Sequence, residues 1–160
     1  MTATCEIKGF TFSAAHSGLH DGVYERMHGH TYTVTVWVHG EPDRHGVIVD
    51  FTLVKQAMRE LLQSLHHRVL IAREPVAGTV RMAGNELHLT DGAKRYVLPA
   101  EDVALLPVAN TTTEAIADHL LNGLIPALEG RPGLYEVEIE LAESPGTSVI
   151  AAADLMAALP

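Results

Sequence analysis

Apolar and polar residues alternate along three stretches of the chain, which predicts β-strands with one buried face. The expected strands cover about residues 5–16, 29–40 and 135–141. In the second strand, the apolar residues from Tyr32 to Val38 share one face, because side chains two positions apart in a strand point the same way. We therefore expect an antiparallel sheet whose inner face is formed by these apolar rows.

Two other stretches carry apolar residues at helical spacing. The first predicted helix covers about residues 51–65, directly after Asp50, a residue type that often caps a helix N-terminus. The second covers about residues 111–128, with Thr111 and Glu114 in the positions of a capping box. Both helices have an apolar stripe that must be buried against the sheet.

Between the predicted helices, from about residue 73 to residue 107, short β-like runs alternate with turn residues. We expect this segment to form a small inserted β meander. The order of elements is then strand, strand, helix, meander, helix and strands. It predicts one α+β domain over residues 1–160, with a four-stranded antiparallel sheet, two helices on one face and the inserted meander.

Composition narrows the classes of protein that the chain can belong to. Its 160 residues are 47% hydrophobic and 19% charged, as in an ordinary globular domain. A formal net charge of -9 argues against binding to nucleic acid or to an anionic membrane. The single cysteine, Cys5, allows no intrachain disulfide, and no signal peptide or membrane-spanning run is apparent. We therefore expect a cytoplasmic protein.

Three histidines are the main candidates for chemistry. His16 ends the first strand in phase with its buried row, and His28 and His30 begin the second strand in phase with Tyr32. If the two strands pair, the three imidazoles share the inner face. Neutral imidazole suits Zn²⁺, and three protein ligands leave one coordination position open for water or substrate. The alternative is that these histidines only decorate strand ends.

Glu143 is a second candidate, because it falls in the buried phase of the last predicted strand. Burial of a lone carboxylate is costly unless hydrogen-bond donors meet it. An amino-pyrimidine type ring would meet it with two parallel N–H groups. The alternative is that the strand ends at Ala142 and that Glu143 lies in solvent.

The chain also resembles the family of 6-pyruvoyl- and 6-carboxy-tetrahydropterin synthases. The motifs that carry the resemblance follow one another along nearly the whole chain outside the meander, and they are Phe12–His16, His28–Tyr32, Val49–Phe51, Leu65–His67, Asn110–Glu114 and Glu143–Pro145. The resemblance implies a tunnelling (T) fold, in which subunits join their sheets as trimers that often stack into hexamers. It implies a homotrimer or homohexamer with a pterin pocket at a subunit interface.

The same resemblance assigns roles to individual residues. It implies Zn²⁺ bound by His16, His28 and His30. It also implies a pterin ring that is anchored by Glu143, with Thr112 and Thr113 beside it. The implied substrate is 7,8-dihydroneopterin or its triphosphate.

The chain departs from the family pattern at the residues that would transfer protons. Tyr24 stands where the family has a catalytic cysteine, and a phenol with an ordinary pKa of about 10 cannot replace a thiolate. A glutamate three residues before His28, here Glu25, resembles the pattern of the subgroup that cleaves the side chain to 6-hydroxymethyl-dihydropterin. Its carboxylate is a candidate general base. His66 replaces the aspartate that usually precedes His67.

We therefore expect a zinc-dependent lyase with C6 side-chain cleavage or elimination, in which Glu25 and His67 are the acid–base residues. Two bland alternatives are a solvated Glu25 beside Arg26 and a His66–His67 pair that only ends a helix. A functional alternative is a zinc- and pterin-binding homologue that has lost catalysis or acts on a different ring substrate.

Overall fold

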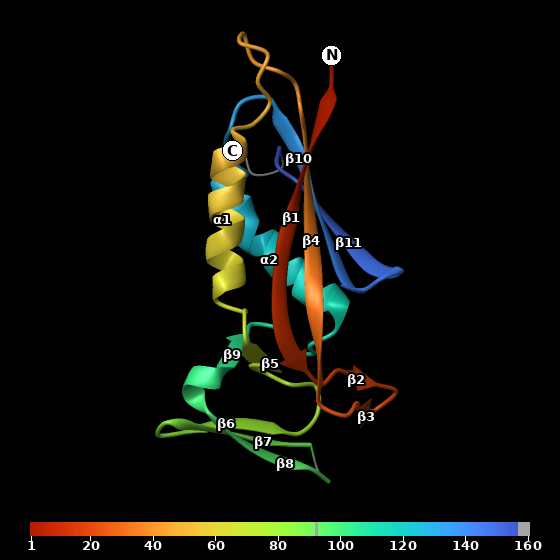
Figure 1. The fold of residues 1–160 in the computed structure, drawn as a ribbon, viewed down its shortest axis with the longest axis vertical. Coiled ribbons are helices and arrows are strands. Elements are labelled where there is room, and N and C mark those ends of the chain that lie inside the picture. The colour runs from red at the N-terminus through yellow and green to blue at the C-terminus, as the bar shows by residue number, and fades with distance from the viewer. Residues whose placement is uncertain (92, 157–160) are drawn as a thin grey trace.

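The computed structural model describes residues 1–91 and 93–156, so residue 92 and the last four residues of the predicted domain lie outside the described residues. A six-stranded sheet forms the main layer, in the order β11-β10-β4-β1-β5-β9 (Figure 1). Its strands are β1 (Ala3–His16), β4 (His28–Gly40), β5 (Arg68–Ala72), β9 (Val103–Leu106), β10 (Leu134–Ser144) and β11 (Thr147–Asp154).

β1 and β4 pair as antiparallel strands along almost their whole length. Their register places Phe12 opposite Tyr32 and His16 opposite His28, so the predicted apolar rows of the two strands share one face. The inner face of both strands is buried, and Tyr32 has no exposed surface. Register is strongly specified here, because a slip by one residue would turn the apolar row and the histidines to the opposite face.

The predicted α+β class is confirmed, and the sheet is wider than predicted. The strands β1, β4, β10 and β11 form the expected antiparallel part. β5 and β9 extend it in parallel orientation on the far side of β1. Each of these two strands has only four or five residues. Such short, largely apolar runs carry no clear period, so the sequence pattern does not assign them to the main sheet.

The two helices pack against the same core. α1 (Phe51–Gln63) begins after Asp50, whose carboxylate accepts from the Thr52 N–H at 2.8 Å. α2 (Thr113–Leu128) is capped by Thr112, whose hydroxyl accepts from the Ala115 N–H at 3.3 Å. The prediction of Thr111 as the cap is therefore wrong by one residue, because the Thr111 hydroxyl donates instead to the Ser17 carbonyl. Of the described residues, no helix combines the length and the apolar character that a bilayer span requires.

Two small sheets lie at one end of the main sheet (Figure 1). β2 (Leu19–His20) and β3 (Val23–Tyr24) form a hairpin between β1 and β4. β6 (Thr79–Ala83), β7 (Glu86–Thr90) and β8 (Arg95–Pro99) form the meander, whose Leu87 and Leu89 share a small core with Ile71 of β5 and Val103 of β9. A short 3-10 helix, Ala100–Asp102, leads back to β9. Only part of the segment 73–107 is thus separate from the main sheet.

Candidate functional site

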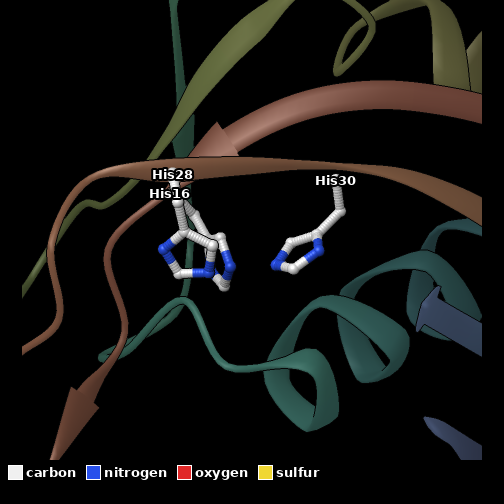
Figure 2. A group of neighbouring side chains, drawn as sticks. All are labelled: His16, His28 and His30. Atoms are coloured by element: carbon white, nitrogen blue, oxygen red, sulfur yellow. The ribbon is translucent and has the colours of Figure 1, made fainter.

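Three imidazoles from β1 and β4 converge on the inner face of the sheet (Figure 2). His16 lies directly opposite His28, and His30 lies two pairs further along, opposite Ala14. One potential ligand nitrogen from each ring lies within 4.8 Å of the others. His16 is only 3% exposed, His30 is half-buried and His28 is exposed, so the group is closed on one side and open on the other.

Backbone carbonyls orient two of these rings. Nδ1 of His16 lies 2.7 Å from the Thr111 carbonyl oxygen, and Nδ1 of His28 lies 2.8 Å from the Arg26 carbonyl oxygen. A carbonyl only accepts, so Nδ1 carries the proton in each ring and Nε2 keeps its lone pair. Nε2 of His16 and of His30 is buried and has no hydrogen-bond partner in the described part of the chain. These nitrogens fit a bound cation.

Burial favours the neutral form of His16, the most buried of the three candidate ligands. Burial is the largest influence on His16, and it lowers the pKa of the imidazole because the charged form loses its hydration. The Thr111 carbonyl opposes this effect, His28 and His30 add to it, and the Glu25 carboxylate opposes it weakly. A neutral imidazole is the form that binds a metal ion, so the ring requires little reorganisation to act as a ligand.

A second histidine–carboxylate group lies at the other end of β4. His39 and the glutamates Glu136 and Glu138 also place potential ligand atoms within 4.8 Å of one another. Here Nε2 of His39 lies 2.8 Å from the Glu138 carboxylate, and its Nδ1 lies 2.9 Å from the Thr4 hydroxyl. Nδ1 is thus hydrogen-bonded to Thr4, whereas Nε2 lies beside the Glu138 carboxylate without a hydrogen bond among the described residues.

Glu143 lies near the end of β10, at a bulge that shifts the register with β11. The Thr113 hydroxyl, on the first residue of α2, donates to Oε2 of Glu143 at 2.5 Å. The strand continues to Ser144, and the half-buried carboxylate turns toward the N-terminus of α2. Thr113 therefore contacts Glu143, whereas the hydroxyl of Thr112 is used in the helix cap.

Tyr32 connects the histidines with the carboxylates, although the sequence pattern marks it only as a core residue. Its ring centroid lies 5.4 Å from that of His30 and 6.3 Å from that of His16. Burial raises the pKa of Tyr32, and the charges of Glu143 and Glu25 raise it further. The buried hydroxyl has no hydrogen-bond partner among the described residues. Both carboxylates therefore act electrostatically on the same buried hydroxyl.

Glu25 lies in the connection between β3 and β4, where two backbone hydrogen bonds hold it. Its N–H donates to the Gly18 carbonyl at 2.9 Å, and its carbonyl accepts from the Ser17 hydroxyl at 2.7 Å. Oε1 of its carboxylate lies 3.7 Å from Nε2 of His20. Glu25 is therefore part of an ordered loop beside the three histidines rather than a free loop residue.

His66 and His67 follow α1 and stack on each other with ring centroids 3.8 Å apart. The Ser13 N–H donates to Nδ1 of His66 at 3.1 Å, and the His67 N–H donates to the Ser13 carbonyl at 2.7 Å. His67 adopts a left-handed backbone, with φ of 59°. Neither imidazole hydrogen-bonds to Glu25 or to the three histidines within the described chain, so one chain alone does not bring Glu25 and His67 into contact.

Tyr24, in the position of the missing cysteine, has a structural contact. Its hydroxyl donates to the Ala77 carbonyl at 2.8 Å, which ties the β2–β3 hairpin to the start of the meander. Burial raises the pKa of the phenol, so it is a poorer nucleophile than a free tyrosine.

The mixed sheet, the two helices on one face and the histidine cluster together define the T-fold class of pterin enzymes. Within that class, the chain belongs to the 6-pyruvoyl tetrahydropterin synthase family, whose sequence model matches residues 6–154.

Individual relatives agree with this assignment. The chain is 29% identical over 143 residues to a candidate 6-carboxy-5,6,7,8-tetrahydropterin synthase of Methanocaldococcus jannaschii, covering 86% of each protein. It is 23% identical over 141 residues to the 6-carboxy-5,6,7,8-tetrahydropterin synthase of Rickettsia conorii, covering 86% of this chain and 92% of that protein. The structure of a Plasmodium vivax 6-pyruvoyltetrahydropterin synthase, with a catalytic glutamate replaced by alanine, superposes with a TM-score of 0.91 at 22% identity over 96% of this chain and 99% of that one.

Proposed function

We propose that this protein is a zinc-dependent lyase that acts on 7,8-dihydroneopterin or its triphosphate and cleaves or eliminates part of the C6 side chain. One observation carries the proposal. Three imidazoles converge, the Nε2 atoms of His16 and His30 are buried without a hydrogen-bond partner among the described residues, and His30 lines one pocket with the half-buried Glu143. Membership of the family supports a pterin as the class of substrate. An acidic chain with one cysteine fits work in the cytoplasm.

His16, His28 and His30 would hold the Zn²⁺ ion. Three neutral nitrogen ligands without cysteine are typical of a catalytic zinc site rather than a structural one. When bound, Zn²⁺ supplies Lewis-acid stabilisation for negative charge that develops on a side-chain oxygen of the substrate. The backbone carbonyls that fix the tautomers of His16 and His28 keep the ligand nitrogens ready for the ion.

Glu143 would orient the pterin. One of its oxygens accepts from Thr113, and the remaining lone pairs can accept the two parallel N–H groups of an amino-pyrimidine ring. Thr112 would support this geometry by holding the first turn of α2, on which Thr113 lies. With the ring held in this way, the C6 side chain extends toward the histidines.

Glu25 would act as the general base and His67 as the general acid. In cleavage, the base removes the proton of the hydroxyl on the second side-chain carbon, and the bond between the first and second carbons breaks. The acid then returns a proton to the ring fragment. That a glutamate is a catalytic residue in the Plasmodium vivax protein supports a carboxylate base. Since Glu25 and His67 lie apart within one chain, we infer that a second subunit of a trimer or hexamer supplies His67.

The assay is direct. Zinc-loaded protein is incubated with 7,8-dihydroneopterin and, separately, with its triphosphate, and the products are identified by mass spectrometry. We expect turnover of at least one compound, with loss of side-chain carbons or of triphosphate, and no turnover after removal of zinc by a chelator. Absence of turnover with both compounds would rule out the proposal.

A second candidate is a zinc- and pterin-binding protein without the lyase reaction. It is favoured by Tyr24, whose hydroxyl is engaged with Ala77, and by His66, which replaces a carboxylate and hydrogen-bonds to the Ser13 backbone. Under this candidate, zinc and pterins bind, yet Glu25→Gln changes no rate. A purine-like ring that competes with the pterin for binding would indicate a different ring substrate.

A further inference from the structure

Lys94 reaches from the meander to the loop that carries Glu25. Its ammonium donates to the carbonyl oxygens of both Tyr24 and Glu25, each at 3.2 Å. The two partners are consecutive residues that are about 70 positions away in the sequence. One side chain of the meander therefore holds two successive peptide groups next to the candidate general base.

Lys94 is itself held in place. Asp91 accepts from the Lys94 N–H at 2.7 Å, and its other carboxylate oxygen lies 3.9 Å from the ammonium. The Asp91 side chain is only 8% exposed. A carboxylate that is buried to this degree needs a compensating partner, and the ammonium of Lys94 provides it. The Lys94 side chain is 38% exposed, so its two carbonyl contacts hold the ammonium more than the long pair with Asp91 does.

The meander contacts the same loop at a second point, where the Tyr24 hydroxyl donates to Ala77. Tyr24 and Asp91 also line one small pocket, together with Ser17 and Thr111, whose carbonyl orients His16. The Glu25 loop is thus attached to the main sheet through Gly18 and Ser17, and to the meander through Lys94 and Tyr24.

We propose that Lys94 is a positioning residue for Glu25, and that the meander serves to place it. By holding the carbonyls of Tyr24 and Glu25, the ammonium fixes the backbone from which the Glu25 carboxylate faces the histidine cluster. This inference rests on the proposed role of Glu25 as general base. A displacement of a catalytic group by about 1 Å costs on the order of 100-fold in rate, so the tether matters for catalysis more than for stability.

The test compares Lys94→Met, which keeps the apolar stem and loses all donors, with Lys94→Arg, which keeps charge and donors. Lys55→Met, at an exposed position of α1, is the matched control. In Lys94→Met we expect kcat on 7,8-dihydroneopterin to fall roughly 10- to 100-fold with KM and zinc content nearly unchanged. Lys94→Arg should recover most of the rate. Should Lys94→Met fail to fold, Lys94→Leu, which also lacks donors, replaces it under the same criteria.

Two further measurements separate positioning from general destabilisation. Combined with Glu25→Gln, Lys94→Met should cause no additional loss of kcat, because its effect passes through Glu25. Amide hydrogen exchange of residues 18–27 should be faster in Lys94→Met than in wild type and unchanged in Lys55→Met, with or without zinc.

Wild-type kcat in Lys94→Met would overturn the inference, and so would an equal further loss in the Glu25→Gln background. If wild-type protein turns over neither pterin, the proposed function fails. The hydrogen-exchange measurement then tests, without any rate, whether Lys94 holds the loop of Glu25. Unchanged exchange of residues 18–27 in Lys94→Met would overturn it.

Discussion

The candidate metal ligands and the proposed acid–base residues are held in different ways. His16, His28 and His30 are carried by β1 and β4, two long strands that pair along almost their whole length. Glu25 and His67 are carried by connections, one after a two-residue strand and the other just after α1. Strand residues are placed by a repeating ladder of backbone bonds, whereas each loop residue needs its own tethers.

Because of this difference, the three histidines can stay in place while the residues on the connections change. The histidines are fixed by the same register that buries the core, so the fold itself preserves their positions. The loop of Glu25 depends on individual contacts from Gly18, Ser17 and Lys94. Tyr24, at the position where the resemblance implies a cysteine, lies in β3 and outside both β1 and β4.

The largest expected effect tests the strand side. Replacement of His30 by alanine removes one of three ligands, and we expect zinc affinity to fall by more than about 100-fold, since loss of a supporting partner alone costs 10- to 100-fold. Turnover should disappear together with the metal. The measurement is zinc content after dialysis against a competing chelator. His45→Ala, at an exposed loop position, is the control. Retention of zinc in His30→Ala would contradict the assignment of ligands.

The next largest effect concerns Glu25, on the connection between β3 and β4. Glu25→Gln should lower kcat by about 10²- to 10⁴-fold, the usual contribution of a general base, while zinc content stays at the wild-type value. Steady-state kinetics and metal analysis on one preparation check both parts. A wild-type rate would favour the binding protein without lyase activity.

His67→Asn should lower kcat by roughly 100-fold, near the lower limit for a general acid, because no carboxylate precedes it. Asparagine tolerates the left-handed backbone at this position, so the change tests the imidazole rather than the turn. His45→Asn again serves as the control. If the acid comes from a second subunit, inactive Glu25→Gln and His67→Asn chains mixed in one oligomer should recover part of the rate. An unchanged rate in His67→Asn alone would remove this residue from the mechanism.

Glu143→Gln should act on binding. A charge-assisted hydrogen bond contributes about 1.5–3 kcal/mol, so we expect KM for the pterin to rise roughly 10- to 100-fold with a smaller change in kcat. Thr113→Val, which removes the donor to Glu143, should shift KM in the same direction by less. Both are measured from initial rates. A loss confined to kcat would place Glu143 among the acid–base groups instead.

The smallest effect concerns pH and stability. Burial lowers the pKa of His16 and of His119 in the folded protein, so the unfolded chain binds more protons just below the ordinary histidine pKa of about 6.5. Stability from both residues is complete above that pH and is lost as the pH falls through the lowered values. We expect the Tm of zinc-free protein to decrease from pH 7 to pH 5.

Zinc and a single substitution should separate the two contributions. Saturating zinc should suppress the part due to His16, because the bound ion competes with the proton, and leave the part due to His119. His119→Gln should remove only the latter. Thermal denaturation at both pH values, with and without zinc, measures this. A His119→Gln variant with the full pH dependence would show that His119 does not contribute.

The sequence predicts the positions of the three histidines on the strands well and those of the residues on the connections poorly. Period-two alternation places His16, His28 and His30 on one face, because register and burial have the same cause. The predicted cap of the second helix is wrong by one residue. Thr111 and Thr112 are both good caps, and only the contact with Ser17 distinguishes them. The sequence could not reveal Lys94, because its partners lie far away in the chain and a single lysine in a turn has no pattern.

The orientation of two candidate ligands by main-chain carbonyls has a consequence for how this protein can vary. Every amino acid carries a carbonyl group, so no exchange of side chain at position 26 or 111 deletes the acceptor that His16 or His28 uses. Where a carboxylate side chain orients a metal ligand instead, a substitution can remove the acceptor. The side chains at these supporting positions can therefore change without loss of the orienting contacts. The only requirement is that the path of the backbone is preserved.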